Sequence, residues 1–160
     1  MADKTHKYQV QVTWTGNEGK GTASYRSYSR AHVITADGKA SIEGSSDPGF
    51  RGDRTRWNPE ELLLASLSAC HKLWYLGLCA EAGLVVLAYE DNPHATMVEE
   101  ANGAGQFTSV VLRPTVILAP GSEIAKAQAL HEIAHAKCFI ARSVNFPVSH
   151  VAEIAISQDR

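Results

Sequence analysis

Residues 58–76 read NPEELLLASLSACHKLWYL and predict a long central helix. Asn58 suits the N-cap, Pro59 suits the first helical position, and the two acidic residues that follow suit the positive end of the helix dipole. The helix is expected to run to about Ala82, with Gly83 as its stop, over roughly 36 Å. Because nearly every face of this helix is apolar, it should lie in the centre of the molecule. A single chain of 160 residues has too little material to bury it, so we expect a dimer.

The chain before this helix alternates polar and apolar residues with a period of two, which is typical of half-buried strands. Four strands are expected there, at residues 8–15, 21–25, 28–36 and 40–45. The first two should form one hairpin, and the last two should turn at Asp37-Gly38. Residues 45–57, SSDPGFRGDRTRW, contain two Gly, one Pro and three Arg and are expected to form an ordered loop.

The chain after the central helix predicts a hairpin, a second helix and a last strand. Its expected elements are a long hairpin at 84–100 and 106–119, a helix from Gly121-Ser122 to about Lys137, a short continuation at 138–145 and a strand at 147–157. The hairpin should turn at Asn102-Gly103. This order of elements predicts a single α+β domain over residues 1–160.

The composition predicts a globular protein with no strong electrostatic partner. The chain has 15 Lys and Arg against 17 Asp and Glu, a formal charge of -2, and 44% hydrophobic residues. This balance creates no field that would gather nucleic acid or an anionic membrane. No apolar run reaches the length of about 20 residues that a membrane span needs, and residues 1–10 lack the apolar core of a secretion signal. We therefore expect a cytoplasmic protein without a membrane partner.

Three cysteines, Cys70, Cys79 and Cys138, are too few and odd in number for a disulfide framework. In a reducing compartment they are expected to be free thiols, one or two of them with a chemical role. Cys79 lies about 180° round the helix from Cys70 and roughly 13 Å further along it, so these two thiols cannot pair. We expect Cys79 to be a core residue.

The second helix carries His131, Glu132, His135 and Cys138. At 100° per residue the two histidines and the cysteine fall within about 60° of one another. Protonated imidazoles there would lower the pKa of the thiol, although a polar stripe with one packed cysteine has the same pattern. HEIAH at 131–135 also matches the HExxH pattern of zinc hydrolases, but no third ligand stands at the usual spacing. A zinc hydrolase remains the less favoured alternative.

Two segments resemble the signatures of the OsmC/Ohr family, the organic hydroperoxide reductases. They are NPEELLLASLSACHKLWYL at 58–76 and HAKCFIARSVNFPV at 135–148. The resemblance covers nearly the whole chain in element order and is greatest to the OsmC-like branch, which has Cys-His after the helix signature. It implies an intertwined homodimer, with two central helices wrapped by antiparallel β-sheets and active sites at the interface.

The resemblance also implies a peroxidase mechanism and its residues. Cys70 matches the peroxidatic cysteine, which reduces an organic hydroperoxide to an alcohol and becomes a sulfenic acid. Cys138 matches the resolving cysteine, which forms the Cys70–Cys138 disulfide. A dithiol, with lipoylated protein as the donor in the peroxidases, would reduce that disulfide. No other cofactor is expected.

The family's carboxylate maps to Glu60, about 15 Å along a straight helix from Cys70, which is too far for it to act as a base. In the family this carboxylate holds an arginine that stabilises the thiolate. By its position alone, Glu60 could instead be an acidic residue that stabilises the helix N-terminus. The arginine's expected place falls near Gly49, so Arg51 is the first candidate. Arg54 and Arg56 are the next candidates, and Arg30, which lies outside this loop, is the last.

An apolar cleft would favour alkyl or aryl hydroperoxides over hydrogen peroxide. Phe50 and Trp57, with Trp74 and Phe139, are the aromatic candidates to line it, although all four could instead be core residues. His71, which differs from the peroxidases, is a further candidate for substrate contact. A dimer of the same fold that binds a small molecule without turning it over is the alternative from another functional class.

Overall fold

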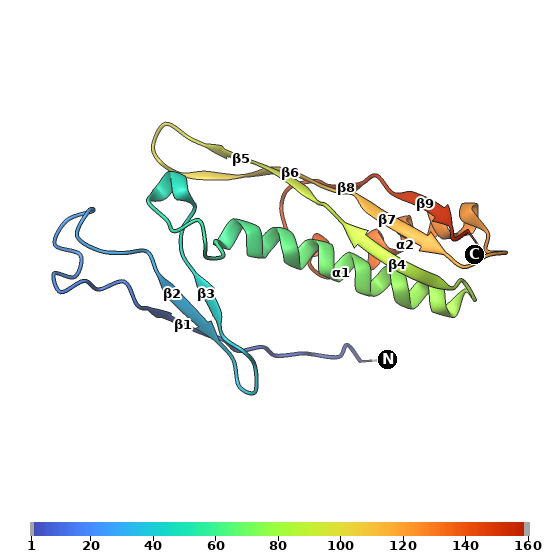
Figure 1. The fold of residues 1–160 in the computed structure, drawn as a ribbon, viewed down its shortest axis with the longest axis horizontal. Helices are drawn as coiled ribbons and strands as arrows, with labels where there is room; N and C mark the ends of the chain where they lie inside the picture. The colour runs from blue at the N-terminus through green and yellow to red at the C-terminus, as the bar shows by residue number, and fades with distance from the viewer. Residues whose placement is uncertain (1, 159–160) are drawn as a thin grey trace. The chain divides into compact units, whose positions relative to one another are not determined.

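A computed structural model describes residues 2–158 (Figure 1). Two compact units are distinguished, one up to Leu62 and one from Leu63 onward. The described chain contains helices and strands in the mixed order that the sequence predicts, so the α+β class is confirmed.

The first unit contains a three-stranded antiparallel sheet. Its strands are β1 (Gln11–Trp14), β2 (His32–Thr35) and β3 (Ile42–Gly44), in that order across the sheet. The hairpin of β2 and β3 around Asp37-Gly38 is confirmed, and Gly38 takes a left-handed φ of 69° in the turn. The predicted strand at 21–25 is wrong, because β1 pairs with β2 and residues 15–31 form a loop between them.

Local side-chain contacts explain why that segment is a loop. The side-chain oxygen of Asn17 accepts hydrogen bonds from the N–H groups of Gly19 and Gly21, each at 3.0 Å. The guanidinium of Arg30 stacks on the rings of Tyr25 and Tyr28 and donates to both of their carbonyl oxygens. Several backbone groups that a strand would pair are thereby satisfied within the loop.

Residues 45–57 form the expected ordered loop, with a short 3-10 helix η1 (Pro48–Phe50) inside it. The carboxylate of Asp47 accepts a hydrogen bond from the Gly49 N–H at 2.6 Å. The loop returns to the sheet at Trp57, whose N–H donates to the Glu43 carbonyl at 3.1 Å.

The central helix α1 (Pro59–Glu81) confirms the prediction. The Asn58 side chain accepts from the Glu61 N–H at 2.8 Å, and the Glu61 carboxylate accepts from the Asn58 N–H at 3.4 Å. This is a reciprocal N-terminal cap. Gly83, with a φ of 72°, follows the end of the helix.

Only one stripe of α1 is buried within the chain. Its fully buried side chains lie four positions apart and are Leu67, His71, Tyr75 and Cys79. Leu73, on another face, is 67% exposed. Among the described residues, α1 is the one helix whose length and apolar character would suit a membrane span, a test that the core helix of a soluble protein also passes.

The second unit contains two mixed sheets that run beside α1 (Figure 1). One has the order β4 (Val86–Asp91), β7 (Pro114–Leu118) and β9 (Glu153–Ile156); the other has the order β5 (His94–Glu99), β6 (Gly105–Leu112) and β8 (Val148–His150). The predicted long hairpin is confirmed, since β5 pairs with β6 and β4 pairs with β7. It is interrupted at Asn92-Pro93 because proline cannot donate a ladder hydrogen bond.

The predicted single strand at 147–157 is wrong in one respect. The segment forms two strands, β8 and β9. The long hairpin is split into two sheets, and β8 joins the sheet of β6 whereas β9 joins the sheet of β7. Both strands run parallel to their partners β6 and β7, so each sheet combines one antiparallel pair with one parallel pair. Val151, between the two strands, still donates its N–H to the Leu112 carbonyl at 2.8 Å.

The second helix α2 (Ile124–Lys137) begins later than predicted. Gly121-Ser122 do not cap it: Gly121 forms a left-handed turn, and Glu123 occupies the N-cap without a side-chain hydrogen bond. The expected continuation beyond Lys137 is the 3-10 helix η2 (Ala141–Ser143).

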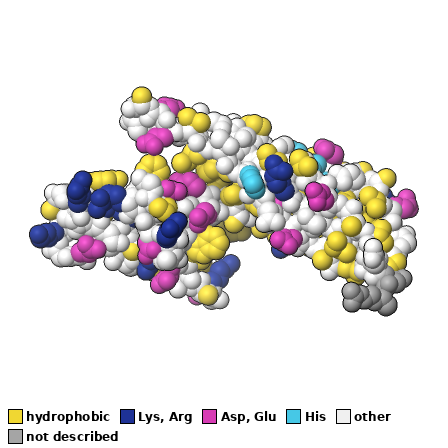
Figure 2. All heavy atoms as spheres, turned by 45° about the horizontal axis from the view of Figure 1, so that its top comes forward, with side chains coloured by type: hydrophobic (Ala, Val, Ile, Leu, Met, Phe, Trp, Pro, Cys, Tyr) yellow, Lys and Arg dark blue, Asp and Glu magenta, His cyan; other side chains and the backbone are white. Residues whose placement is uncertain are grey.

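The larger core cluster lies between α1, α2 and the sheet of β4, β7 and β9. Its buried members are Tyr75, Cys79, Leu84, Val116, Leu118, Ala127, Leu130 and Ala134. A smaller cluster packs Leu67 of α1 against Val110 and Leu112 of β6. Apolar side chains also remain at the surface, as the space-filling view shows (Figure 2).

Candidate active site

Cys70 and Cys138 lie side by side in the second unit. Cys70 is on α1 and is partly exposed, whereas Cys138 follows α2 and is 1% exposed. Burial raises the pKa of the Cys138 thiol to about 11, and the neighbouring Cys70 thiol adds to this rise. The Ala141 N–H donates to the Cys138 sulfur at 3.4 Å. The more accessible thiol is therefore that of Cys70.

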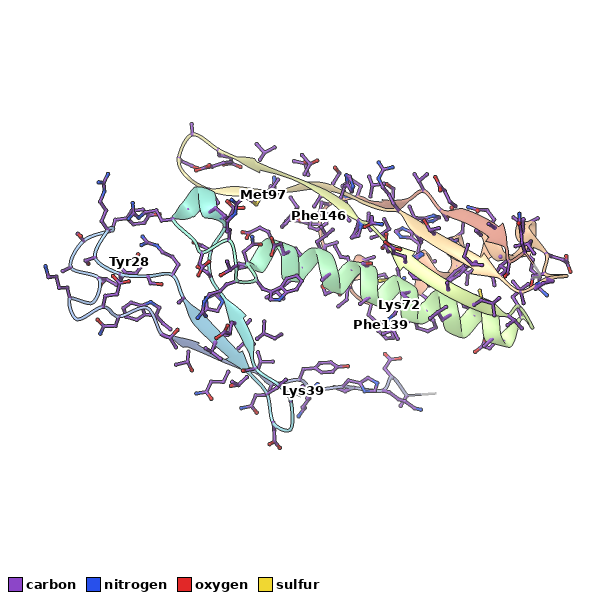
Figure 3. The ribbon with its side chains drawn as sticks, viewed as in Figure 1. Tyr28, Lys39, Lys72, Met97, Phe139 and Phe146 are labelled. Atoms are coloured by element: carbon purple, nitrogen blue, oxygen red, sulfur yellow. The ribbon has the colours of Figure 1, made fainter. Side chains whose placement is uncertain are left out.

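A pocket of about 410 Å³ opens beside Cys70. Its lining residues come from α1 and from the end of α2 and are Cys70, Leu73, Trp74, Gly77, Leu78, Glu81, Lys137 and Phe139. The rings of Trp74 and Phe139 meet edge to face with centroids 5.6 Å apart; Phe139 is labelled in Figure 3. Trp74 and Phe139, two of the four aromatic candidates for lining a cleft, thus line this pocket.

Two charged residues of this pocket were missed in the sequence. The Lys137 Nζ atom lies 5.3 Å from the centroid of the Trp74 ring, and Glu81 lines the same pocket. Glu81 is about three helical turns from Cys70, so helical periodicity alone could have placed it on that face. Lys137 immediately precedes Cys138.

Cys79 is a core residue, as predicted. It is 1% exposed in the larger core cluster, and burial raises the pKa of its thiol. The raised pKa disfavours the reactive thiolate.

We predict that Cys79→Ala lowers the free energy of unfolding by about 1–2 kcal/mol, because it removes one buried atom from the core. The access of a thiol reagent to Cys70 should be unchanged, because Cys79 lies in the core away from the pocket. Urea denaturation measures the first effect, and the rate of thiol labelling at Cys70 measures the second. A changed labelling rate at Cys70 in this variant would contradict a purely structural role for Cys79.

A layer of buried imidazoles lies behind the thiols. The parallel rings of His71 on α1 and His131 on α2 have centroids 5.3 Å apart, and His71 Nε2 lies 2.9 Å from His131 Nδ1. Burial, with a smaller contribution from neighbouring histidines, lowers the pKa of His71 to about 4 and that of His131 to about 3. Both rings are therefore neutral near pH 7.

This corrects one of the two interpretations of the second helix. The pKa of Cys138 is not lowered by protonated histidines; it is raised by burial, because the nearby imidazoles are themselves desolvated and neutral. His71 is 1% exposed and is not among the residues that line the pocket, so contact between His71 and a substrate stays a prediction.

The HEIAH segment at 131–135 does not assemble a metal site. His131 Nδ1 is engaged with His71, and the exposed carboxylate of Glu132 faces His150 Nε2 at 3.3 Å. Within residues 2–158 no three His, Cys, Asp or Glu side chains are grouped so that they could hold a metal ion. The zinc hydrolase alternative therefore has no ligand set within the described part of the chain.

The remaining predicted site residues belong to the first unit. Glu60 has a buried carboxylate oxygen without a hydrogen-bond partner in the described chain. Arg51 is the one non-glycine residue among those described with a positive φ, 64°. Phe50 and Trp57 are 37% and 53% exposed.

Two of the four candidate arginines are occupied elsewhere in that unit. Arg56 forms an ion pair with Glu43 at 3.6 Å and donates to the His32 carbonyl, and Arg30 is stacked between two tyrosines. For Arg51 and Arg54 no ion pair occurs with any residue from 2 to 158.

The fold and the adjoining thiols define a class of small α+β proteins with a cysteine pair where two helices meet. The chain belongs to the family of OsmC-like proteins, whose model matches residues 52–152. The resemblance seen in the two sequence signatures is thereby confirmed.

Solved structures agree with this assignment. An OsmC-like protein of unknown function from Vibrio cholerae is 30% identical with a TM-score of 0.84, and the match covers 92% of this chain and 99% of that one. An organic hydroperoxide resistance protein from Elizabethkingia anophelis is 21% identical with a TM-score of 0.67, covering 96% and 100%. The organic hydroperoxide resistance protein OhrB of Bacillus subtilis is 21% identical with a TM-score of 0.61, covering 92% and 98%. No curated protein matches the chain.

Proposed function

We propose that the protein is a thiol peroxidase that reduces organic hydroperoxides to alcohols. The observation that carries the proposal is the accessible Cys70 thiol, which lies beside the buried Cys138 thiol and faces a pocket with apolar walls. Two structural neighbours are named as organic hydroperoxide resistance proteins, which agrees with this chemistry.

The reaction proceeds in three steps. The Cys70 thiolate attacks the outer oxygen of the hydroperoxide, the O–O bond breaks, and the alkoxide takes a proton to leave as an alcohol. The resulting sulfenic acid condenses with the Cys138 thiol, which forms the disulfide and releases water. An external dithiol, such as a lipoylated protein, then reduces the disulfide and becomes a cyclic disulfide itself. This cycle suits a reducing compartment such as the cytoplasm.

The pocket sets the expected substrate class. Leu73, Trp74 and Phe139 offer apolar surface next to Cys70, so an alkyl or aryl tail gains about 25 cal/mol per Å² that it buries. Hydrogen peroxide has no such tail and should be a poor substrate.

The proposal includes a homodimer built from a single domain per chain. Apolar side chains on the exposed faces of α1 remain uncovered within one chain; Leu73, for example, is 67% exposed. A second copy of the chain would bury them. Light scattering should give a mass of about twice the 17.3 kDa of one chain. A mass of one chain at micromolar concentration would exclude the dimer.

The test is an intact-mass and free-thiol measurement after one equivalent of an aryl hydroperoxide is added to reduced protein. The proposal expects the loss of about two mass units and of two thiols, mapped to Cys70 and Cys138. Unchanged mass with three free thiols would overturn the proposal and favour a dimer that binds small molecules without turnover.

We also propose that Glu60 holds Arg51 for use at the Cys70 thiolate. The buried carboxylate oxygen of Glu60 needs a donor, and a guanidinium remains charged at any working pH. Arg51 sits in a left-handed conformation that costs a non-glycine residue roughly 1–2 kcal/mol, as functional residues often do.

We predict that Arg51→Ala and Glu60→Gln each slow the reaction of Cys70 with hydroperoxide about tenfold, the loss of about one charge-assisted hydrogen bond. Stopped-flow measurement of sulfenic acid formation checks this result. Arg54→Ala is the matched control on the same loop and should react at the wild-type rate. A slow Arg54→Ala variant beside a normal Arg51→Ala variant would transfer the role to Arg54.

A further inference from the structure

The helices that carry the two reactive thiols are joined by three hydrogen bonds in the described chain. Tyr75 donates to the Ala127 carbonyl at 3.2 Å, and Lys126 donates to the Ala82 carbonyl just beyond α1 at 2.8 Å. The third is the contact between the imidazoles of His71 and His131 at 2.9 Å.

The imidazole contact is the one nearest to the thiols along both helices. His71 follows Cys70 directly on α1, and His131 stands about two turns before Cys138 on α2. The other two contacts join residues further along each helix. Of these three hydrogen bonds, the imidazole contact therefore bears most directly on the separation of Cys70 and Cys138, together with the packing of Trp74 against Lys137 and Phe139.

The imidazole contact requires both rings to be neutral. A neutral imidazole has one N–H and one lone pair, so one ring donates and the other accepts. A proton on the accepting ring would place two N–H groups against each other. A proton on the donating ring would leave an unpaired cation in the core, where His71 Nδ1 and His131 Nε2 already have no partner in the described chain.

Among residues 2–158, no buried carboxylate is packed against the pair. Tyr75 on α1 and His150 on β8 pack directly against the pair, and His135 on α2 lies near it. Further out, Tyr89 on β4 contacts Tyr75, and Glu132 on α2 contacts His150. Glu132 is exposed and contacts only His150 of this group. A protonated pair would thus be relieved by separation of α1 from α2 and entry of water.

We propose that His71 and His131 are positioning residues for disulfide formation: while neutral, they hold α1 and α2 at the spacing at which the Cys138 thiol reaches the Cys70 sulfenic acid. This inference rests on the proposed peroxidase function. It makes the condensation step, and not the first attack on hydroperoxide, dependent on the imidazole contact.

The test measures the two steps separately in the full-length protein. A dimedone-type reagent traps the Cys70 sulfenic acid and reports the first step, and intact mass reports the disulfide. His131→Leu should slow disulfide formation by about 10- to 100-fold, the effect of a misplacement of about 1 Å, and should change sulfenic acid formation by less than about twofold. His131→Gln, which keeps a polar contact without a titrating ring, should recover part of the loss.

Leu130→Ala is the matched control for packing, because Leu130 is a core residue of α2 outside the imidazole contact. It lowers stability without touching the pair and should leave the ratio of the two rates unchanged. If His131→Leu and Leu130→Ala changed both steps alike, the role would be merely structural and the inference would be wrong.

The pH profile of the wild-type protein decides the question even where a variant fails to fold. Ionisation of the Cys138 thiol alone gives the logarithm of the condensation rate a slope of about one against pH between 7.5 and 3.5. Protonation of the imidazoles adds to that slope at the acid end, while circular dichroism confirms that the protein is folded. A slope of one throughout would overturn the inference, whereas the absence of sulfenic acid at every pH would overturn the peroxidase itself.

Discussion

Cys70→Ser should abolish hydroperoxide consumption, because a serine hydroxyl at neutral pH is no substitute for a thiolate that attacks an O–O bond. No other thiol can replace it. Cys138 is 1% exposed with a raised pKa, and Cys79 is buried in the core. Peroxide consumption measured with a dye-based assay should fall to the uncatalysed rate.

Cys138→Ser gives the complementary result. This variant should consume one equivalent of hydroperoxide and stop, with Cys70 held as sulfenic acid or oxidised further to sulfinic acid. Cys79→Ser, with the same exchange at a buried position, is the control and should turn over. Full activity of Cys70→Ser would refute the mechanism, since the reacting sulfur would then be elsewhere.

Acidification from pH 8 to pH 5 should reduce the free energy of unfolding by on the order of 2 kcal/mol for each of His71 and His131. Burial lowers the pKa of His71 to about 4 and of His131 to about 3, while an unfolded histidine has a pKa of about 6.5. The unfolded chain therefore binds more protons than the folded chain below pH 6.5. Stability is full above that pH and falls as the pH moves from about 6.5 towards 4 and 3.

Urea denaturation at several pH values and at one fixed protein concentration measures this effect, since a dimer's stability varies with concentration. His150 shifts in the same direction and adds to the loss. His131→Gln should remove one histidine's share of the pH dependence, whereas His94→Gln, at an exposed position of β5, should leave it unchanged. A free energy that stays flat between pH 8 and pH 5 would show that the imidazoles are solvated.

The sequence predicts the parts of this fold that are determined by a few neighbouring residues. The cap at Asn58, the stop at Gly83 and the turn at Asn102-Gly103 are chosen by backbone geometry within a few residues, so α1 and the long hairpin could be located. The signature around Cys70 likewise indicates the family, which the match over residues 52–152 confirms.

Other features depend on contacts between distant residues and could not be read locally. The alternating pattern at 21–25 fits a strand, yet Arg30 stacked on Tyr25 and Tyr28 makes it a loop. From the sequence, histidines on one helical face could be protonated groups that lower the pKa of a thiol, or ligands of a zinc ion. Only the approach of α1 shows that His131 meets His71 and is neutral.

The parallel pairing of the last two strands has a consequence for the order in which the chain folds. The hairpin of β5 and β6 joins neighbouring residues and can form early, whereas Val148 must find Val110 and Glu153 must find Thr115 across the whole of α2. Closing so long a segment of chain lowers its conformational entropy before the strand contacts contribute any stabilisation. His150 lies on β8 and joins the histidine layer only when β8 has paired with β6, so we expect the layer to be completed late in the folding of the second unit.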